Sequence, residues 1–472
     1  MRNTRVRRVG ALLIGLALTA AACGSDEDEA DSTTAATEAP AATEAPAETE
    51  APAATEAPAE TEAPAETEAP AETDAPAGTD APAGEGVCAG ESDGQLHIGT
   101  VLPQTGNLAF LGPPEFAAVQ LAVDDINAAG GVLGQDVVLT QGDSGDTSTD
   151  IANQTVDAGL AAGVDAFIGA ASSGVSFTFI DKLVENCKIH FSPANTSPDF
   201  TTYDDGGLYF RTAPSDVLQG RVLADLMIEE GVTNAVFMAL QDPYGEGLLK
   251  YSSEPYADQG GEVLDSFTYD PTLSNFNAEV ERVVSADPEA LVLIGFAESA
   301  QILTGLFENG FTPDVKKIYL VDGNVGNALA EGFAPGAFFG MKGTLPAAET
   351  TQEFKDALLA VDPELIDYSY APESYDAVVI TALAAAIAGT DDPGMIATEI
   401  NGVTRDGEKC TTFADCIALI DAGTDIDYDG PSGPQTFSDA GEPTEASFQI
   451  LSYDENNKVD GDIPPVYKFA KI

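Results

Sequence analysis

The chain has 472 residues, and its 19 lysines and arginines against 79 aspartates and glutamates give a formal net charge of −60. At roughly 100–200 residues per domain, this length allows two or three domains with a substantial core. So acidic a chain argues against electrostatic binding of nucleic acid or anionic lipid, because both need clusters of Lys and Arg. His97 and His190 are the only histidines, which excludes a metal site built from several of them. We therefore expect no nucleic-acid partner, no metal and no cofactor.

The first 23 residues have the pattern of an export signal. Arginines at positions 2, 5, 7 and 8 precede an uncharged stretch at 9–22. A helix of that length reaches about 21 Å, short of the roughly 30 Å hydrocarbon core, so a signal peptide is favoured over a membrane span. The residues AAACG at 20–24 resemble a bacterial lipobox, in which cleavage leaves Cys23 as a lipid-modified N-terminus. An ordinary secretory signal with an incidental cysteine is the alternative.

Residues 24–86 form a low-complexity segment in which a Thr-Glu-Ala-Pro unit brings a proline every six residues. The unit has almost nothing apolar to bury, and no Lys or Arg offsets its carboxylates, so we expect a disordered, extended tether. At about 3.1 Å per residue its contour approaches 200 Å. Such a tether would hold a folded domain away from the membrane. A specific binding role for the repeat is the alternative.

Residues 87–472 form the folded body, in which apolar β-rich runs alternate with helical patterns. We expect strands at 96–102, 137–141, 166–169, 235–240 and 290–294, and helices at 116–128, 151–161, 276–284 and 300–308. Strands separated by helices of this length indicate an α/β fold with parallel sheets and right-handed crossovers. The body is too long for one ordinary open sheet, so we predict two doubly wound lobes. In such sheets, ligands bind at the carboxyl ends of the strands.

Seven blocks of the body stand in the order of one known family. They are IGTVLPQTGNLAFLGPPEFAAVQLAVDDINAAGGVLGQDV (98–137), IGAASSGVS (168–176), SPANTSPDFT (192–201), FRTAPSDVLQG (210–220), QDPYGEG (241–247), LVDGNVGN (320–327) and YAPESYDAV (370–378). Together they resemble the leucine/isoleucine/valine-binding proteins, which are type I periplasmic solute-binding proteins of ABC importers. The resemblance implies two lobes joined by three crossover strands that close on a ligand about a hinge. It places lobe one at about 95–212 and 347–441, and lobe two at about 213–346 and 442–472.

The resemblance also implies a ligand site between the lobes. A ligand carboxylate would be held by hydroxyls and backbone N–H groups at strand-to-helix turns, at Ser173, Ala194 and Thr196. The alternative for the serine and the threonine is a role as helix N-caps with no ligand contact. From the second lobe, Tyr244 and Asp322 would meet the ligand's amino group. A tyrosine that packs only on its own lobe is the alternative for Tyr244.

Parts of this site depart from the family pattern. An ungapped match places Gly323 where the family has its acidic residue, so Asp322 needs a shift of one position. Leu111 stands in the place of a family Trp and Phe296 near a family Tyr, and the chain has no tryptophan at all. A differently sized side-chain pocket follows, and strict leucine specificity is not implied. Tyr375 would either line the cleft or belong to the core at the start of a helix.

Four cysteines of the body are expected to form disulfides, because an exported protein retains them. Cys410 and Cys416 are close enough in sequence for a local bridge. Cys88 and Cys187 would then pair with each other. Free buried cysteines are the alternative for this long-range pair.

Other chemistry-bearing residues receive ordinary structural interpretations. The stretch 425–430 is similar to the start of a calcium loop, but position twelve is Thr436 and two prolines interrupt the pattern, so we interpret it as an acidic turn. Both histidines lie inside strand patterns and are interpreted as core residues with satisfied nitrogens. We find no convincing P-loop or Ser-His-Asp arrangement.

The sequence therefore predicts a solute-binding protein rather than an enzyme. It would be an extracytoplasmic monomer, anchored in the membrane through lipid on Cys23. It would capture a branched-chain amino acid or a related amide or urea-type solute by hinge closure and deliver it to ABC permease subunits. The alternative is a sensing module whose closure signals through a partner receptor.

Overall fold

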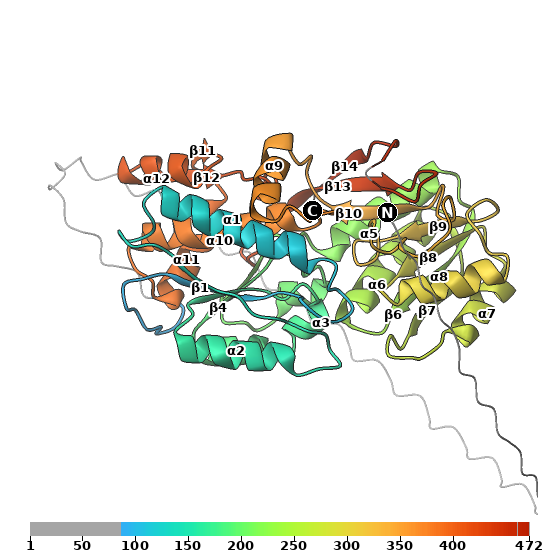
Figure 1. The fold of residues 1–472 in the computed structure, drawn as a ribbon, viewed down its shortest axis with the longest axis horizontal. Coiled ribbons are helices and arrows are strands. Elements are labelled where there is room, and N and C mark those ends of the chain that lie inside the picture. The colour runs from blue at the N-terminus through green and yellow to red at the C-terminus, as the bar shows by residue number, and fades with distance from the viewer. Residues whose placement is uncertain (1–85, 460, 472) are drawn as a thin grey trace, which may run out of the picture. The chain divides into compact units, whose positions relative to one another are not determined.

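The computed structural model describes residues 86–459 and 461–471. Two large sheets organise these residues (Figure 1). The first sheet has the order β2-β1-β3-β4-β5, and all of its neighbours are parallel. Its strands are β1 (His97–Val101), β2 (Val138–Thr140), β3 (Ala166–Gly169), β4 (Ile189–Ser192) and β5 (Tyr209–Arg211). We call this sheet, with the helices packed on it, lobe one.

Helices cover both faces of the first sheet. Ile98 and Ile168 pack in one core with α1 (Gly112–Ala128) and α10 (Ala371–Ala388), whereas Val101 and Phe167 pack in another with α2 (Ile151–Ala162). Figure 1 shows α1 and α2 on opposite sides of the strands. A sheet buried on both faces explains why its strands read as continuous apolar runs.

Lobe one contains further short elements. These are α3 (Ser173–Ser176), α4 (Ile180–Glu185), the 3₁₀ turn η1 (Pro198–Thr202), α9 (Gln352–Val361), α11 (Pro393–Val403), α12 (Phe413–Asp421) and the parallel pair β11 (Glu408–Cys410) and β12 (Ile426–Tyr428). In the described residues, α10 alone is long and apolar enough to cross a membrane, but most of it is buried between α1, α11 and the sheet. It is therefore a core helix of lobe one.

The second sheet, with its helices, forms lobe two, and its order is β14-β13-β10-β9-β8-β6-β7. The strands are β6 (Asn234–Leu240), β7 (Glu262–Tyr269), β8 (Ala290–Ile294), β9 (Lys317–Leu320), β10 (Lys342–Pro346), β13 (Glu445–Ser452) and β14 (Val466–Lys471). The helices are α5 (Asp216–Glu229), α6 (Pro243–Asp258), α7 (Asn277–Ala286) and α8 (Ser299–Glu308). Strands β10, β13 and β14 pair antiparallel, and the remaining neighbours are parallel.

The structure confirms the predicted α/β fold with two doubly wound lobes, and each predicted strand and helix is present within a few residues. β3 and β8 have the predicted limits, whereas α1 begins four residues earlier than expected, at Gly112. Pro113 and Pro114 explain this early start, because proline suits the first helical turn, where backbone N–H groups have no intrahelical partner. The antiparallel edge of lobe two was not predicted.

The chain crosses between the lobes after β5, after β10 and before β13. Arg211, at the end of β5, is fully buried and forms an ion pair with Glu442, which precedes β13. Its guanidinium also donates to the carbonyls of Asn195 and Ser197, at 3.2 and 2.8 Å. This arginine therefore joins two of the crossovers to the loop that follows β4.

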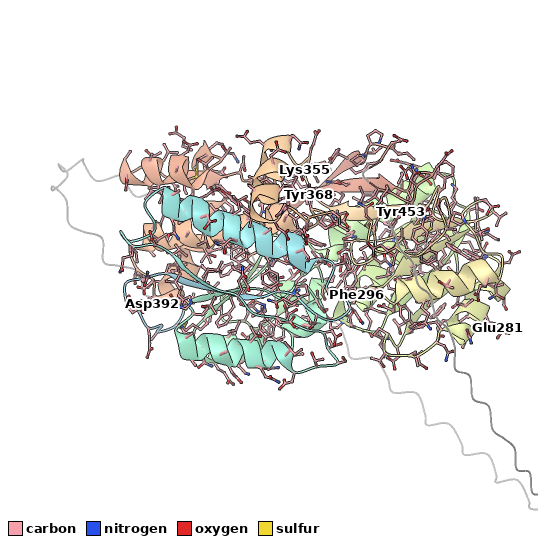
Figure 2. The ribbon with its side chains drawn as sticks, viewed as in Figure 1. Glu281, Phe296, Lys355, Tyr368, Asp392 and Tyr453 are labelled. Carbon is pink, nitrogen blue, oxygen red and sulfur yellow. A yellow bond between two sulfur atoms is a disulfide. The ribbon has the colours of Figure 1, made fainter. Side chains whose placement is uncertain are left out.

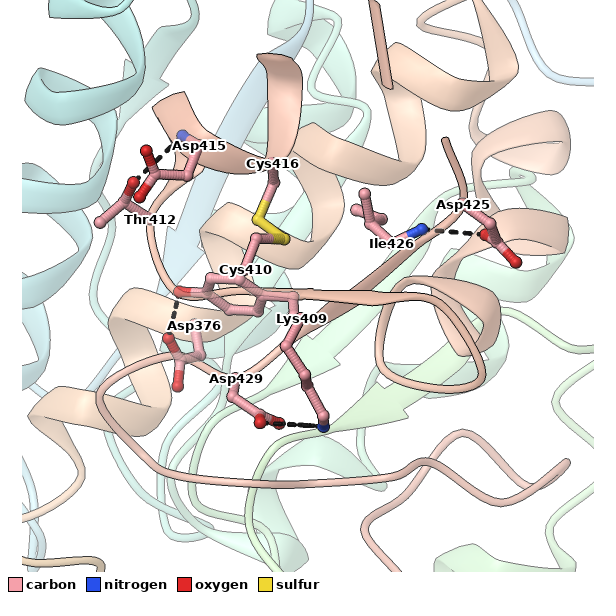
Figure 3. Close-up of a disulfide and its surroundings, with 10 residues drawn as sticks. Asp376, Lys409, Cys410, Thr412, Asp415, Cys416, Asp425, Ile426 and Asp429 are labelled. Atoms are coloured by element: carbon pink, nitrogen blue, oxygen red, sulfur yellow. Dashed lines mark hydrogen bonds and ion pairs between the residues drawn. A yellow bond between two sulfur atoms is a disulfide. The ribbon is translucent and has the colours of Figure 1, made fainter. Parts of the chain in front are cut away.

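Both predicted disulfides are present. Cys88 is bonded to Cys187 and Cys410 to Cys416, across 99 and 6 positions of sequence. Beside the shorter bridge, Lys409 pairs with Asp427 and with Asp429, each at 2.9 Å; Figure 3 shows the latter pair. The stretch 425–430 is therefore not a simple acidic turn, because Ile426–Tyr428 forms β12, paired with β11, and a lysine of β11 partly neutralises its carboxylates.

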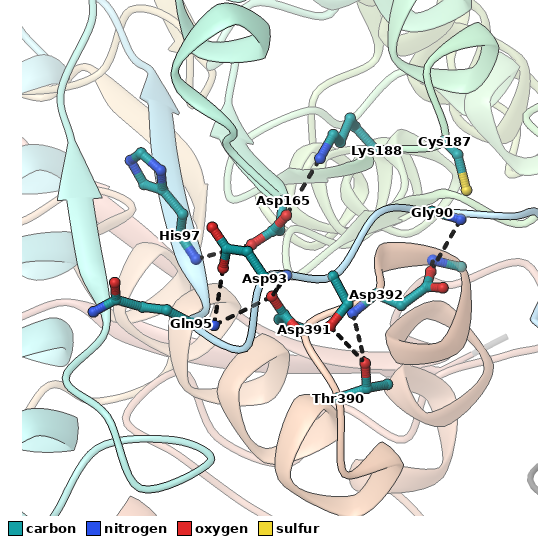
Figure 4. Close-up of polar contacts among 12 residues, drawn as sticks. Gly90, Asp93, Gln95, His97, Asp165, Cys187, Lys188, Thr390, Asp391 and Asp392 are labelled. Carbon is teal, nitrogen blue, oxygen red and sulfur yellow. Dashed lines mark hydrogen bonds and ion pairs between the residues drawn. The ribbon is translucent and has the colours of Figure 1, made fainter.

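The start of the described domain is fixed to lobe one (Figure 4). The Asp391 carboxylate accepts hydrogen bonds from the backbone N–H groups of residues 93–95, at 2.8–3.2 Å. Asp392 accepts a hydrogen bond from the backbone N–H of Gly90 at 3.2 Å. Just before Gly90 in the chain, Cys88 is bonded to Cys187. The predictions for the signal peptide, for a lipid on Cys23 and for nearly all of the repeat fall outside the described residues.

The two histidines only partly match the interpretation from the sequence, which made both of them core residues with satisfied nitrogens. His97 is half-buried, and its Nε2 lies 2.8 Å from the Thr140 hydroxyl. His190 is buried between Phe179 and Tyr209, where burial lowers its pKa to about 3. Neither of its ring nitrogens makes a well-formed hydrogen bond in the described residues, so His190 is a neutral core residue but not a satisfied one.

Candidate functional site

A small cavity lies between the lobes, where the carboxyl ends of β3 and β4 face those of β6, β8 and β9. It is lined by Leu108, Leu111, Ala171, Ser172, Ser173, Ala194, Tyr244, Phe296, Asp322, Gly323 and Tyr370. Its volume is about 10 Å³, room for about one water molecule. Strand ends in doubly wound sheets are the usual position for a ligand.

Ser173 reaches this cavity through a tight turn after β3. Gly169 has φ of 126°, and a Cβ there would stand 2.1 Å from the carbonyl oxygen of Val101, so the turn requires glycine. Ser172 is the N-cap of α3, and its hydroxyl accepts from the backbone N–H of Val175 at 3.3 Å. The Ser173 hydroxyl instead accepts from the backbone N–H of Ser197, at 3.3 Å.

The loop after β4 supplies Ala194 to the cavity wall but does not supply Thr196. Thr196 is buried behind the wall, and its carbonyl accepts from the backbone N–H of Asp216 at 2.8 Å. The N-cap of the following turn is Ser197. Ser173 and Thr196 are therefore not helix N-caps, as the alternative interpretation held. The N-caps are the neighbouring residues Ser172 and Ser197.

Asp322, in the turn after β9, is the acidic group of the cavity. Its Oδ1 accepts from the Tyr244 hydroxyl and from Nε2 of Gln219, both at 2.8 Å. Its Oδ2 accepts from the hydroxyl of Tyr370, a lobe-one residue, at 2.7 Å. Burial raises the pKa of Asp322, and these three hydrogen bonds oppose the increase. Gly323, the alternative position from the sequence, also lines the cavity but brings no charge.

A second carboxylate stands behind Asp322. Asp216 is the first residue of α5 and is fully buried. Burial raises its pKa well above the usual range, and the Asp322 charge raises it further. The Thr196 hydroxyl lies close enough to lower the pKa of Asp216, but neither group makes a well-formed hydrogen bond in the described residues. With no lysine or arginine in its lining, the cavity favours a positively charged group.

Apolar side chains form the rest of the wall. Tyr244 stacks on Phe296, with ring centroids 5.5 Å apart and planes 9° from parallel. Phe296, labelled in Figure 2, also lines a neighbouring cavity of about 160 Å³. The remaining lining residues there include Phe110, Ala297, Ala300, Val325 and Leu329. Space for an apolar ligand side chain is therefore adjacent to the polar groups.

The structure corrects the position of Tyr375. Its ring packs edge-on against Phe354 in the core of lobe one, and its hydroxyl donates to Asp125 at 2.8 Å. Tyr370, five residues earlier, lines the cavity instead. Its φ of 58° is left-handed, which is rare for an aromatic residue and has no signature in the sequence.

The sequence interpretation also missed Asp216 and Gln219. Both lie in the block FRTAPSDVLQG, and a spacing of three residues places them on one face of α5. That spacing was the available signal. Only the structure shows that this face of α5 points at Asp322 rather than at solvent.

Comparison with known proteins identifies the family of the chain. A family profile described as "Periplasmic binding protein" matches residues 95–458. The chain belongs to this family. It is 26% identical, over 73% of its length and 84% of the relative, to the chemotactic signal transduction system substrate-binding protein BasB of Halobacterium salinarum. It is 28% identical, over 77% of its length and 92% of the relative, to Leu/Ile/Val-binding protein homolog 3 of Brucella melitensis.

A solved structure has the same fold. The branched-chain amino acid transporter substrate-binding protein LivJ of Streptococcus pneumoniae, in complex with isoleucine, superposes with a TM-score of 0.65. The match covers 80% of this chain and all of that one, at 22% sequence identity. The fold is therefore that of type I periplasmic binding proteins, and the relatives named here are binding proteins.

Proposed function

We propose that this protein is an extracytoplasmic solute-binding protein that captures a branched-chain amino acid between its two lobes and delivers it to an ABC permease. The main supporting observation is that Ser173 and Ala194 on lobe one face Asp322 and Tyr244 on lobe two across one cavity. A related amide or urea-type solute is the other ligand class that these polar groups suit. No chemistry on the ligand is part of the proposal.

The two walls of the cavity match the two charges of an amino acid. The ligand's ammonium would bind Asp322, the acidic group of the lining. Its carboxylate would bind the Ser173 hydroxyl and the backbone N–H groups of the turn after β3. Charge-assisted hydrogen bonds are roughly twice as strong as neutral ones, so this polarity orients the ligand. The apolar side chain would extend toward Phe296 and the neighbouring cavity.

A binding screen on the mature, full-length protein tests the proposal. A ligand at about 100 times its dissociation constant adds roughly 2.7 kcal/mol to the free energy of unfolding, which is visible as a raised melting temperature. We expect leucine, isoleucine or valine to raise it, and isothermal titration to confirm one site. A response to amides or urea alone would contradict the amino-acid assignment, and silence across the panel would contradict the ligand class as a whole.

Sensing through a partner receptor is the second candidate, and the similarity to a chemotactic substrate-binding protein favours it. The two functions differ in what deletion of the gene removes. Loss of labelled amino-acid uptake supports delivery to a permease. Intact uptake together with a lost behavioural response to the same amino acid supports sensing.

The membrane anchor is a separate part of the proposal, and it rests on the lipobox-like sequence around Cys23. A Cys23→Ser variant should leave the membrane fraction and enter the soluble extracellular or periplasmic fraction. Leu/Ile/Val binding by the released protein should be unchanged, because the site lies wholly in the described domain. Retention of the variant in the membrane would contradict the anchor.

A further inference from the structure

We propose that Tyr370 competes with the ligand's ammonium group for Oδ2 of Asp322 and thereby restricts the site to ligands that carry a cationic donor. The inference rests on the proposed amino-acid function. It assigns a specificity-determining role to a residue that neither the sequence pattern nor the resemblance pointed to.

The hydrogen bonds on Asp322 locate the competition at one oxygen. A carboxylate oxygen has two acceptor positions. Oδ1 already accepts from Tyr244 and Gln219, which are both lobe-two residues and therefore move with Asp322. Oδ2 accepts from Tyr370. The oxygen that a ligand ammonium can reach is thus the one that Tyr370 holds.

The space around Oδ2 does not admit both partners. Tyr370 is 1% exposed and forms part of the cavity wall, and the cavity has room for about one water molecule. An amino acid is several times larger. An amino acid therefore enters only when the lobes separate, and its ammonium then meets Oδ2 in the place that the Tyr370 hydroxyl takes in the closed protein.

The two-lobe construction provides a route for this exchange. Tyr370 precedes α10 on lobe one, whereas Asp322 follows β9 on lobe two, so separation of the lobes breaks their hydrogen bond. Other contacts cross the same gap: the Ser197 hydroxyl donates to the carbonyl of Pro243 at 3.0 Å. The lobes can therefore close on each other with Tyr370 as the donor to Asp322.

This internal donor sets a threshold for ligands. A ligand with an ammonium replaces a neutral O–H donor with a charged one, and a charge-assisted bond is the stronger of the two. A ligand of the same shape without the ammonium breaks the Tyr370 bond and offers Asp322 nothing in return. Buried acceptors left unpaired are costly, so such ligands are rejected.

Titration of leucine into the full-length protein, in wild-type and Tyr370→Phe forms, tests the inference. Tyr375→Phe is the matched control, because it removes a phenol hydroxyl five residues further along the chain, outside the cavity. Removal of the competitor should tighten leucine binding about tenfold, the equivalent of one hydrogen bond to a charged group. The control should bind as wild type does. Structural damage does not produce a gain in affinity, so the expected direction is diagnostic.

A second measurement follows the lobes without ligand. Small-angle X-ray scattering should show a larger radius of gyration for Tyr370→Phe than for wild type or Tyr375→Phe, because the closing contact is gone. Unchanged or weaker leucine binding by Tyr370→Phe, with wild-type binding intact, would overturn the competition alone. Failure of wild type to bind any amino acid would overturn this inference together with the proposed function. Binding of 4-methylpentanoate, which is leucine without its ammonium, as tightly as leucine would overturn the threshold.

Discussion

The two walls of the cavity are built on different chemical principles. Lobe one presents Ser172, Ser173, Ala194 and Tyr370, whose polar groups are hydroxyls and backbone amides. Lobe two presents the ionisable side chains Tyr244 and Asp322, with Asp216 buried behind them. A neutral wall of donors opposite an acidic wall of acceptors would suit the proposed ligand, whose two charges are separated. The contrast also explains how a chain with a net charge of −60 would bind a carboxylate, because local dipoles decide that contact.

The largest expected effect is the loss of the acidic wall. Asp322→Asn keeps the shape of the side chain but removes the charge that faces the ammonium. Truncation of one partner of a buried charge pair costs 2–5 kcal/mol, so leucine binding should weaken about hundredfold or more in isothermal titration. Asp270→Asn, an exposed aspartate of lobe two, is the control and should bind normally. Near-normal binding by Asp322→Asn would remove the electrostatic contrast between the walls.

A smaller effect is expected on the neutral wall, from Ser173→Ala. The variant removes one hydroxyl from a carboxylate that backbone N–H groups also hold, so leucine affinity should fall about tenfold. Ser172→Ala is the matched variant one residue earlier. It removes the N-cap of α3 and should cost about 1 kcal/mol of unfolding free energy while changing affinity less. Equal losses of affinity in the two variants would mean that the turn, and not Ser173 itself, binds the ligand.

The smallest effect concerns the segments that connect the walls. Glu373, in the first turn of α10, lines a narrow cavity among the crossovers, and burial raises its pKa to about 8. The folded protein then holds a proton that the unfolded chain releases near pH 4.5, so stability is lost as pH rises from about 4.5 toward 8. Glu373→Gln should match wild type near pH 4 and exceed it at pH 8.5 by about 1 kcal/mol or more in chemical denaturation. Parallel pH profiles for the two proteins would show that this carboxyl is hydrated.

The sequence predicts the architecture well because its evidence is local. Apolar runs such as 166–169 and 290–294 have the length and composition of strands buried on both faces, and their alternation with helices indicates the parallel sheets. The positions of Ser173, Ala194, Tyr244 and Asp322 at the cavity were implied by the family resemblance, and each comes shortly after a strand ends, where doubly wound sheets bind ligands.

What the sequence did not predict depends on contacts between distant segments. Tyr370 reaches the cavity through a left-handed backbone conformation just before α10, whereas Tyr375, inside α10, faces the core. Nothing in the residue types distinguishes the two tyrosines. Asp216 and Gln219 likewise look like ordinary residues in the first turn of a helix until α5 is placed against β10, with Gln219 in contact with Asp322 and Thr344. The antiparallel pairing of β13 and β14 also arises from tertiary packing rather than from a local pattern.

The contacts at the start of the described domain bear on which lobe would move in the proposed hinge closure. Asp391 and the Cys88–Cys187 disulfide hold the first described residues against lobe one, on the same body as α11 and β4. If the preceding chain is the proposed anchor, it would therefore hold the protein through lobe one and not through the crossovers. In a protein anchored as proposed, lobe one would stay fixed relative to the membrane, and lobe two, which carries Asp322, would move toward and away from it.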